Sequence, residues 1–245
     1  MEPAVRIVAG VALSAGVAAI ASWRAALTRS GAWAAAVTGT ILVLAGWRWL
    51  ALVGVFFITS SVLTRLEAPA GATRRSGDRG GRRWRQVAAN GGIAAAAAAV
   101  YAITGWPQGF AVAAGAVAAA TADTWATELG RWSQTPPRLI TTGRPVTPGT
   151  SGGVTLIGTL ASLTGATFIA STAIILSGVT PAAGAGMSGR LLWGVSIALA
   201  GVTGSMLDSV LGATVEGRWS WLDNDAVNIT ATAWAAAVML LVPIS

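Results

Sequence analysis

The residues best suited to chemistry are six of the nine acidic side chains, which fall into three short segments. These segments contain Asp123 and Glu128 in TADTWATELG, Asp208 and Glu216 in GSMLDSVLGATVE, and Asp223 and Asp225 in LDNDAVN. Each segment lies at one end of a long apolar run, and a carboxylate inside hydrocarbon costs about 2.5–3.5 kcal/mol. Such residues usually face a polar cavity, a partner or a cation. Because the chain has no histidine and no cysteine, a cation bound there would be a hard, oxygen-seeking ion such as Mg²⁺.

Helical spacing places hydroxyl groups and small residues beside these acids. Thr121, Thr124 and Glu128 share one helix face by their i, i+3, i+7 spacing, with Asp123 on the adjacent face. On a later helix, Asp208 lies within a stripe of small residues that lets a ligand or another backbone come close. Asp123 and Asp208 could instead pair with arginines, and the candidates are Arg131, Arg138 and Arg144. Cation binding and ion pairing both stay open.

Asp223, Asn224 and Asp225 have an alternative of their own, since they precede the last expected helix. Asp and Asn are preferred N-cap residues because their side chains accept hydrogen bonds from the unpaired helical N–H groups. Capping does not explain Asn228, which lies one helical turn after Asn224. Asn90, near the start of an earlier helix, is a similar candidate for a buried polar group with a function.

The segment RWSQTPPRLITTGRPVTPGTSGG, residues 131–153, has the composition of a phosphate-binding loop. It carries hydroxyls, arginines and glycines and leads into an expected helix, whose free N–H groups and dipole favour an anion. It is not a Walker A motif, because Thr150 stands where that motif requires lysine. The alternative is an ordinary polar loop in which a Ser or Thr caps the helix.

The chain that positions these residues is typical of an all-α, polytopic transmembrane bundle. Of its 245 residues, 54% are hydrophobic and only 10% are charged. Apolar runs long enough to cross about 30 Å of hydrocarbon predict one integral membrane domain, residues 1–245, with about eight helices. We expect the helices near residues 4–21, 32–46, 48–65, 86–104, 108–129, 152–177, 189–214 and 226–243. The segment Gly46-Trp47-Arg48 is either a break between two helices or a kink in one.

The arginines predict the orientation in the membrane. All 16 basic residues are arginine, so lysine-dependent chemistry is excluded. With eight helices, the four arginine-bearing loops fall on one side, which the positive-inside rule makes cytoplasmic, and both termini lie outside. We therefore expect a protein of the cell (inner) membrane with its site on the cytoplasmic side. Tryptophans 47, 49, 106 and 193 are expected near the opposite rim.

Residues 67–84 are rich in glycine and arginine and have no apolar periodicity, which predicts a flexible basic cytoplasmic loop. Its role would be contact with anionic lipids or, alternatively, holding a substrate phosphate.

Five segments resemble the signature blocks of the membrane family called domain of unknown function 92: RQVAANGG, TADTWATELG, PPRLITTGRPVTPGTSGGVTLIGTLAS, GSMLDSVLGATVE and LDNDAVN. That family includes the transmembrane protein 19 group and the plant and cyanobacterial phytyl-phosphate kinases. The resemblance implies transfer of a phosphate from a nucleoside triphosphate, CTP in the related polyprenol kinases, to a prenyl monophosphate. The pattern of dolichol kinases and phosphatidate cytidylyltransferases is more distantly similar. Those enzymes have lysines in the loop where this chain has Arg138 and Arg144.

On this resemblance we expect an isoprenoid-phosphate kinase that uses Mg²⁺ and CTP. The expected metal ligands are Asp123, Glu128, Asp208, Asp223 and Asp225, of which Asp123 and Asp208 are also catalytic. Substrate and nucleotide contacts are expected from Asn90, Thr124, Arg138, Thr141, Thr142, Arg144, Thr150, Ser151, Gly152, Gly153, Ser209, Asn224 and Asn228. The expected partners are an isoprenoid lipid phosphate, membrane lipids and the nucleotide, and no nucleic acid.

Two rival functions use the same residues differently. A CTP-dependent lipid-phosphate cytidylyltransferase would share the metal and triphosphate site but release pyrophosphate. A proton- or cation-coupled transporter or a lipid scramblase would place acids near the membrane midplane and contain internal repeats. No clear repeat is visible, and the acids cluster at one rim.

Overall fold

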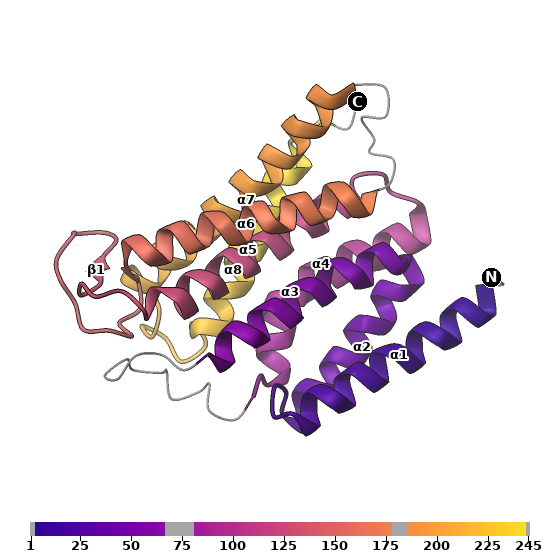
Figure 1. Cartoon of the computed structure of the whole chain (residues 1–245), viewed down its shortest axis with the longest axis horizontal. Coiled ribbons are helices and arrows are strands. Elements are labelled where there is room, and N and C mark those ends of the chain that lie inside the picture. Colours follow the sequence, from indigo (N-terminus) through magenta and orange to yellow (C-terminus); the bar gives the residue numbers. More distant parts are fainter. Residues whose placement is uncertain (1–2, 67–80, 178–185, 244–245) are drawn as a thin grey trace.

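The computed structural model describes residues 3–66, 81–177 and 186–243, and most of them lie in helices (Figure 1). The helices of this part are α1 (Pro3–Trp23), α2 (Arg29–Ala45), α3 (Trp47–Arg65), α4 (Trp84–Thr104), α5 (Gly109–Gly130), α6 (Leu156–Ser177), α7 (Gly186–Thr214) and α8 (Asn224–Leu240). Two short antiparallel strands, β1 (Arg138–Leu139) and β2 (Gly153–Val154), lie between α5 and α6. The prediction of an all-α bundle of about eight helices is confirmed.

Gly46 separates α2 from α3, so this region forms two helices and not one kinked helix. Its φ of 127° belongs to the region that favours glycine, and α3 begins directly after it at Trp47. The two helices then run in opposite directions. Arg65 Nη2, at the end of α3, donates a 2.7 Å hydrogen bond to the carbonyl of Arg24, which lies in the turn just before α2.

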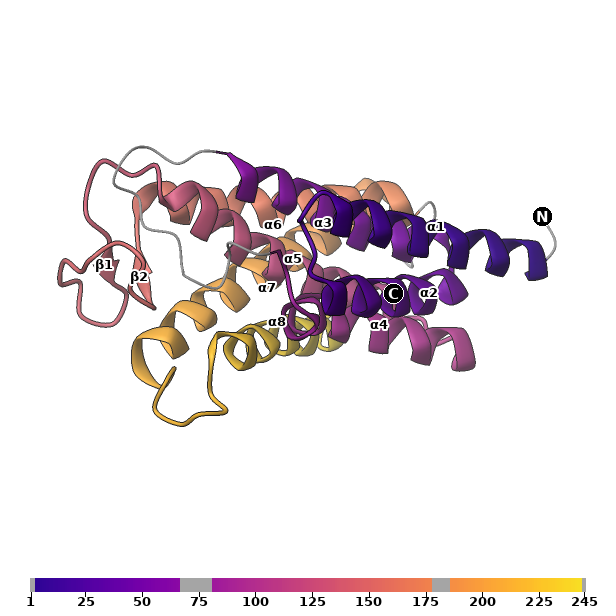
Figure 2. The ribbon, with the colours of Figure 1, turned by 90° about the horizontal axis from the view of Figure 1, so that it is seen from below.

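The four arginine-bearing connections meet at one end of the bundle (Figures 1 and 2). The α1–α2 turn pairs with the segment before α4, since Thr28 N donates to Arg82 O at 3.1 Å. Arg85, at the start of α4, forms an ion pair of 2.9 Å with Asp223, directly before α8. Gly152, in the α5–α6 connection, packs against the end of α7. In the described part of the chain, the helices therefore alternate in direction as the arginine pattern predicts.

Of the predicted flexible loop 67–84, residues 67–80 lie outside the described residues. Residues 81–83 are held by contacts with other parts of the chain, and Trp84 begins α4. Arg82 N donates to Ala26 O at 3.0 Å, and its guanidinium carbon lies 5.3 Å from the centre of the Phe56 ring. Backbone pairing and cation–π contact thus fix this segment, neither of which its polar composition indicates.

Helix α5 lies at the centre of the bundle, and all residues from 109 to 122 are buried. Most of them are alanine or glycine, so neighbouring backbones come close. A Cβ added to Gly201 of α7 would lie 2.7 Å from Ala118 Cβ, and one on Gly204 would lie 2.7 Å from Ala119 Cβ. Within lipid, association depends on such close van der Waals packing, because burying apolar surface there gives little driving force. The small-residue stripe of α7 therefore packs against α5.

Four helices are long and apolar enough to span a membrane: α3, α4, α6, and α7 over Ser188–Thr214. Two of the tryptophans expected near the opposite rim face other helices. Trp49 and Trp193 are only 0% and 6% exposed and belong to the core, where Trp49 packs edge-on against Phe110 with ring centres 5.3 Å apart. In a core built mainly of alanine, these large rings fill the volume that small side chains leave.

Candidate functional site

Two cavities lie at the end of the bundle that carries the arginine-bearing connections, and the polar end of α5 separates them. The smaller measures about 380 Å³ and is termed the arginine cavity, after Arg24, Arg65 and Arg82 in its wall. The larger measures about 550 Å³ and is termed the loop cavity, because much of its wall comes from residues 130–155. Asp123, Thr127 and Glu128 of α5 line both cavities.

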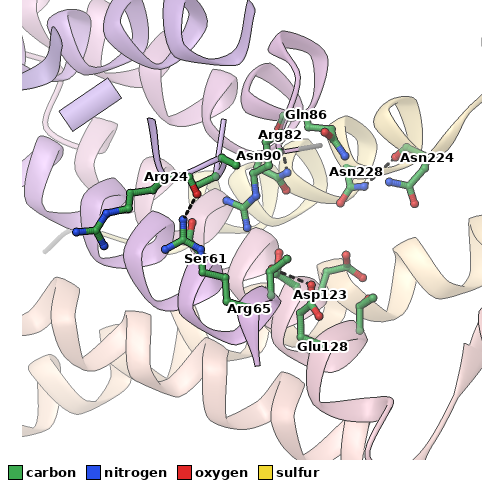
Figure 3. A pocket seen from close by; sticks show the side chains of 16 residues that line it. Arg24, Ser61, Arg65, Arg82, Gln86, Asn90, Asp123, Glu128, Asn224 and Asn228 are labelled. Atoms are coloured by element: carbon green, nitrogen blue, oxygen red, sulfur yellow. Dashed lines mark hydrogen bonds between the residues drawn. The ribbon is translucent and has the colours of Figure 1, made fainter. Parts of the chain in front are cut away.

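Three kinds of side chain surround the arginine cavity (Figure 3). The guanidinium groups come from the α1–α2 turn (Arg24), the end of α3 (Arg65) and the segment before α4 (Arg82). Side-chain amides come from α4 and α8: Gln86, Asn90, Asn224 and Asn228. Carboxylates come from α5: Asp123 and Glu128. The cavity therefore combines cations, amides and acids from six parts of the chain.

The two helical asparagines are held in matching ways. Asn90 Nδ2 donates to the Gln86 carbonyl at 2.9 Å, and Asn228 Nδ2 donates to the Asn224 carbonyl at 2.8 Å. In each residue the amide nitrogen is tied to its own helix, which leaves Oδ1 as the acceptor available to a ligand. Asn90 Oδ1 is buried and accepts no hydrogen bond within the described chain. A buried acceptor without a partner costs about 1–3 kcal/mol, which a ligand that supplied a donor or a cation would offset.

Glu128 is engaged through both of its carboxylate oxygens. Oε1 accepts a 2.8 Å hydrogen bond from the Thr64 hydroxyl, and Oε2 forms an ion pair with Arg131. Glu128 is only 7% exposed, so these contacts tie the end of α5 to α3 and to the loop that follows α5. Pairing with Arg131, considered above for Asp123 and Asp208, is thus observed at Glu128. Glu128 fits a positioning role better than the predicted role of metal ligand.

The loop cavity is lined by hydroxyls, glycines and acids. Among the predicted site residues it includes Asp123, Glu128, Thr150, Gly152, Gly153, Asp208 and Ser209. Its described lining carries four carboxylates, from Asp123, Glu128, Asp208 and Glu216, and one arginine, Arg131. The cavity also reaches Ser162 of α6 and Val202 of α7. It therefore extends from the polar loop into the helical part of the bundle.

The tip of the loop turns away from both cavities. β1 pairs with β2, and within the turn Gly143 N donates to Leu139 O at 2.7 Å. Arg138 Nη1 donates to the Gly143 carbonyl at 2.8 Å, on the outside of this turn. Four predicted nucleotide contacts are exposed there and belong to neither described cavity lining: Arg138, Thr141, Thr142 and Arg144. Ser151 is also outside both linings.

The predicted anion cradle at the start of α6 takes a different form. The helix begins at Leu156, and its cap is Thr155, whose Oγ1 accepts from Gly158 N at 3.0 Å. Gly153 N donates to Thr150 O at 3.0 Å, so that amide serves a turn. The threonine-capped loop, the alternative to a phosphate cradle, therefore describes this helix start. The residues just before it form β2, which moves the helix start beyond the glycines.

The carboxylates do not form one metal cluster. Asp223 caps α8, accepting from Ala226 N at 3.1 Å, and pairs with Arg85, while Asp225 Oδ2 lies 3.6 Å from Arg85 Nε. Neither residue lines a described cavity, whereas Asp123 lines both and Asp208 lines the loop cavity. Among the described residues, no group of three or more acids is close enough to hold a metal ion. The five expected ligands thus divide into separate places.

Sequence reasoning missed the guanidinium groups of the arginine cavity. Arg24 and Arg65 were interpreted only through their effect on topology, whereas for loop 67–84, which contains Arg82, holding a substrate phosphate was the alternative to contact with anionic lipids. The sequence did contain a signal that these arginines lie near the site, because all three lie in connections predicted on one side of the membrane. Which arginines face inward depends on the pairing of the α1–α2 turn with the segment before α4, a contact between residues more than 50 positions apart.

Comparisons with known proteins agree with this architecture. Residues 12–236 match the model of a family described as integral membrane protein DUF92. Protein PGR of Arabidopsis thaliana is 36% identical over 232 residues, which cover 88% of this chain and 81% of that protein. An uncharacterized membrane protein of Methanocaldococcus jannaschii is 31% identical over 248 residues, covering 99% and 96%. Protein VTE6, chloroplastic, of Arabidopsis thaliana is 29% identical over 226 residues, covering 88% and 65%. No solved structure matches the chain significantly.

Proposed function

Because the chain belongs to the integral membrane family DUF92, we propose that it is an isoprenoid-phosphate kinase. It would transfer a phosphate from a nucleoside triphosphate to a prenyl or phytyl monophosphate in the membrane. The resemblance to phytyl-phosphate and polyprenol kinases supports this reaction class and favours CTP as the donor.

The observation that carries the proposal is the place of Asp123, which lines both cavities. On one side of it lie three guanidinium groups, and on the other lies the cavity that contains Asp208. Phosphoryl transfer needs a donor and an acceptor aligned on either side of the moving group, with its charge neutralised. Two adjoining cavities that share a carboxylate suit a reaction of two substrates.

In this reaction an oxygen of the acceptor phosphate attacks the terminal phosphorus of the triphosphate. The bond from that phosphorus to the bridging oxygen breaks, and the nucleoside diphosphate leaves. The acceptor is already an anion with no proton to remove, so the absence of histidine from the chain is no obstacle. The arginines of the smaller cavity would bind phosphate oxygens through paired N–H donors.

The side chains near Asp123 fit a hard cation, because the available ligands are all oxygens. Asp123 and Asp208 would hold Mg²⁺, and the unsatisfied Asn90 Oδ1 adds a further acceptor to the arginine cavity that Asp123 also lines. When bound, Mg²⁺ supplies charge neutralisation on the phosphate oxygens. Glu128, engaged with Thr64 and Arg131, would keep the end of α5 in place.

The same end of the bundle would face the cytoplasm of a cell membrane, with both termini outside. The four connections that carry most of the arginines gather there, which is the distribution the positive-inside rule describes. A water-soluble nucleotide and a membrane-dissolved acceptor would meet at this rim.

The test uses purified full-length protein in liposomes with Mg²⁺, a nucleotide and geranylgeranyl or phytyl monophosphate. CTP or ATP labelled at the γ-phosphate should give a labelled lipid diphosphate. CTP labelled at the α-phosphate should leave the lipid unlabelled, whereas labelled CDP-lipid would identify a cytidylyltransferase. Lipid or cation flux without any lipid product would instead support the transporter or scramblase.

A further inference from the structure

We propose that the arginine cavity binds the polyphosphate of the nucleotide, and that the loop cavity receives the acceptor lipid. This assignment rests on the proposed kinase function. It reverses the expectation from sequence, in which loop 131–153 holds the triphosphate.

The charges of the two linings differ in sign. The arginine cavity sets three guanidinium groups against Asp123 and Glu128, and Glu128 is already paired with Arg131. The described lining of the loop cavity has four carboxylates and one arginine. A triphosphate carries more negative charge than the acceptor monophosphate, so Coulomb attraction favours the triphosphate in the arginine cavity. Mg²⁺ held by Asp123 and Asp208 would offset the repulsion that the less charged acceptor phosphate meets in the loop cavity. The loop arginines that sequence reasoning assigned to the nucleotide, Arg138 and Arg144, lie outside both linings.

Two of the three arginines, Arg65 and Arg82, are also held in position before any ligand binds, while the Arg24 guanidinium lies over the Trp23 ring at 5.4 Å. Arg65 Nη2 donates to the Arg24 carbonyl at 2.7 Å. Arg82 is fixed through its backbone, since Arg82 N donates to Ala26 O and Arg82 O accepts from Thr28 N. Its side chain stacks above the Phe56 and Phe57 rings. Pre-positioned groups lose less conformational entropy on binding, which strengthens their contribution to affinity.

Asn90 offers a ligand of this cavity a buried acceptor, which is an observation independent of the charges. Its Oδ1 is buried and accepts no hydrogen bond from any described residue, while its Nδ2 is bonded to Gln86 O. Figure 3 shows Asn90 and Arg82 on one side of the cavity and Asp123 on the other. A polyphosphate bound with its cation, or a nucleotide amino group, would satisfy this oxygen.

The loop cavity has the shape that a lipid needs. It reaches inward to Ser162 of α6 and to Val202 and Met206 of α7. Met206 is 53% exposed, so an apolar side chain of this lining reaches the surface of the bundle. An acceptor could place its phosphate near Asp123 and Asp208 and lead its prenyl chain out between α6 and α7.

The assignment is tested by binding, which does not depend on turnover. Affinities for CTP and for inorganic triphosphate are measured by calorimetry on purified full-length protein in detergent with Mg²⁺. The variants are Arg24→Gln and Arg65→Gln, both at exposed side chains, and the control is Arg29→Gln. Arg29 begins α2, is exposed and lies outside both described linings. Its replacement by glutamine removes the same charge as the two cavity variants do.

We expect each cavity variant to bind CTP and inorganic triphosphate about ten-fold or more weakly than the wild type, which is the loss expected for a charge-assisted contact. Arg29→Gln should bind both ligands as the wild type does. Geranylgeranyl monophosphate should bind both cavity variants as it binds the wild type. Unchanged triphosphate affinity in Arg24→Gln and Arg65→Gln would overturn the assignment but leave the kinase proposal standing. If the cavity variants lost lipid binding and kept triphosphate binding, the arginine cavity would be the acceptor site and the assignment would be wrong. A wild-type protein that binds neither ligand would overturn both proposals.

Discussion

The hydroxyl of Thr64, at the end of α3, donates a 2.8 Å hydrogen bond to Oε1 of Glu128, at the end of α5. Because Arg131 binds the other carboxylate oxygen, Glu128 connects α3, α5 and the loop after α5. The same side chain lies in the walls of both cavities. The buried Glu128 carboxylate therefore fixes the end of α5, which separates the two cavities of the proposed reaction.

Replacing Thr64 with valine should destabilise the bundle. The substitution keeps the shape of the side chain but leaves Glu128 Oε1, buried with its side chain, without this donor. The expected cost is about 1–3 kcal/mol, measured as a lower midpoint of thermal unfolding in detergent. Thr59→Val is the matched control on the same helix, because the Thr59 hydroxyl bonds carbonyls of its own helix, those of Val55 and Phe56. Equal losses in the two variants would contradict a special role for the Thr64–Glu128 contact.

The helices could be predicted from the sequence because lipid imposes a simple pattern. Apolar runs, arginine-bearing connections and the glycine at 46 mark the eight helices, and no predicted end differs from the structure by more than four residues. The largest error is at the start of α6, predicted at residue 152 and observed at Leu156. There a strand pairing with residues 138–139 competes with the helix, and local sequence does not reveal that contact.

The site was only partly predictable. Asp123, Asp208, Asn90 and Asn228 stand out because polar groups in apolar helices are costly, and all four line a cavity. The three cavity arginines come from separate connections, and only closure of the bundle brings them into the lining of one cavity. Conversely, the exposed loop residues around Arg138 have the right chemistry for phosphate, but the β1–β2 hairpin carries them away from the cavities.

Asp208→Asn should reduce phosphate transfer by at least about 100-fold, because the amide lacks the negative charge that a Mg²⁺ ligand supplies. CTP binding should weaken less than it does in Arg24→Gln or Arg65→Gln, since Asp208 is not part of the arginine cavity lining. Initial rates with γ-labelled CTP, alongside calorimetry, separate the two effects. Ser196→Ala, on the same helix and bonded to the Leu192 carbonyl, is the control and should keep wild-type rates. Full turnover by Asp208→Asn would remove Asp208 from the catalytic site.

Asp223 should tolerate asparagine better than alanine. Its side chain caps α8 by accepting from Ala226 N and also pairs with the half-exposed Arg85. Asparagine keeps the cap, whereas alanine removes it, at a cost of about 0.5–2 kcal/mol. The ion pair, being solvent-exposed, adds little. Unfolding midpoints of Asp223→Asn and Asp223→Ala give the comparison, and a larger loss with asparagine would show that charge outweighs capping.

Gly152→Ala should be among the most damaging small substitutions in the loop. Gly152 has a φ of 75°, and an added Cβ would lie 2.6 Å from Ser209 O and would collide with Ala213 of α7. The variant combines backbone strain with overpacking, each costing about 1–3 kcal/mol. It would also displace the loop cavity wall that Gly152 shares with Ser209. Lower unfolding temperature and weaker binding of geranylgeranyl monophosphate are expected together.

Gly143→Ala separates the effect of backbone strain from the effect of overpacking. Gly143 has a similar φ of 68°, but nothing lies within 4 Å of an added Cβ. This variant therefore suffers the backbone strain alone, at about 1–2 kcal/mol, and should leave lipid binding unchanged because Gly143 is outside the loop cavity lining. If both glycine variants lost the same stability and the same affinity, close packing of Gly152 on α7 would not be what shapes the acceptor site.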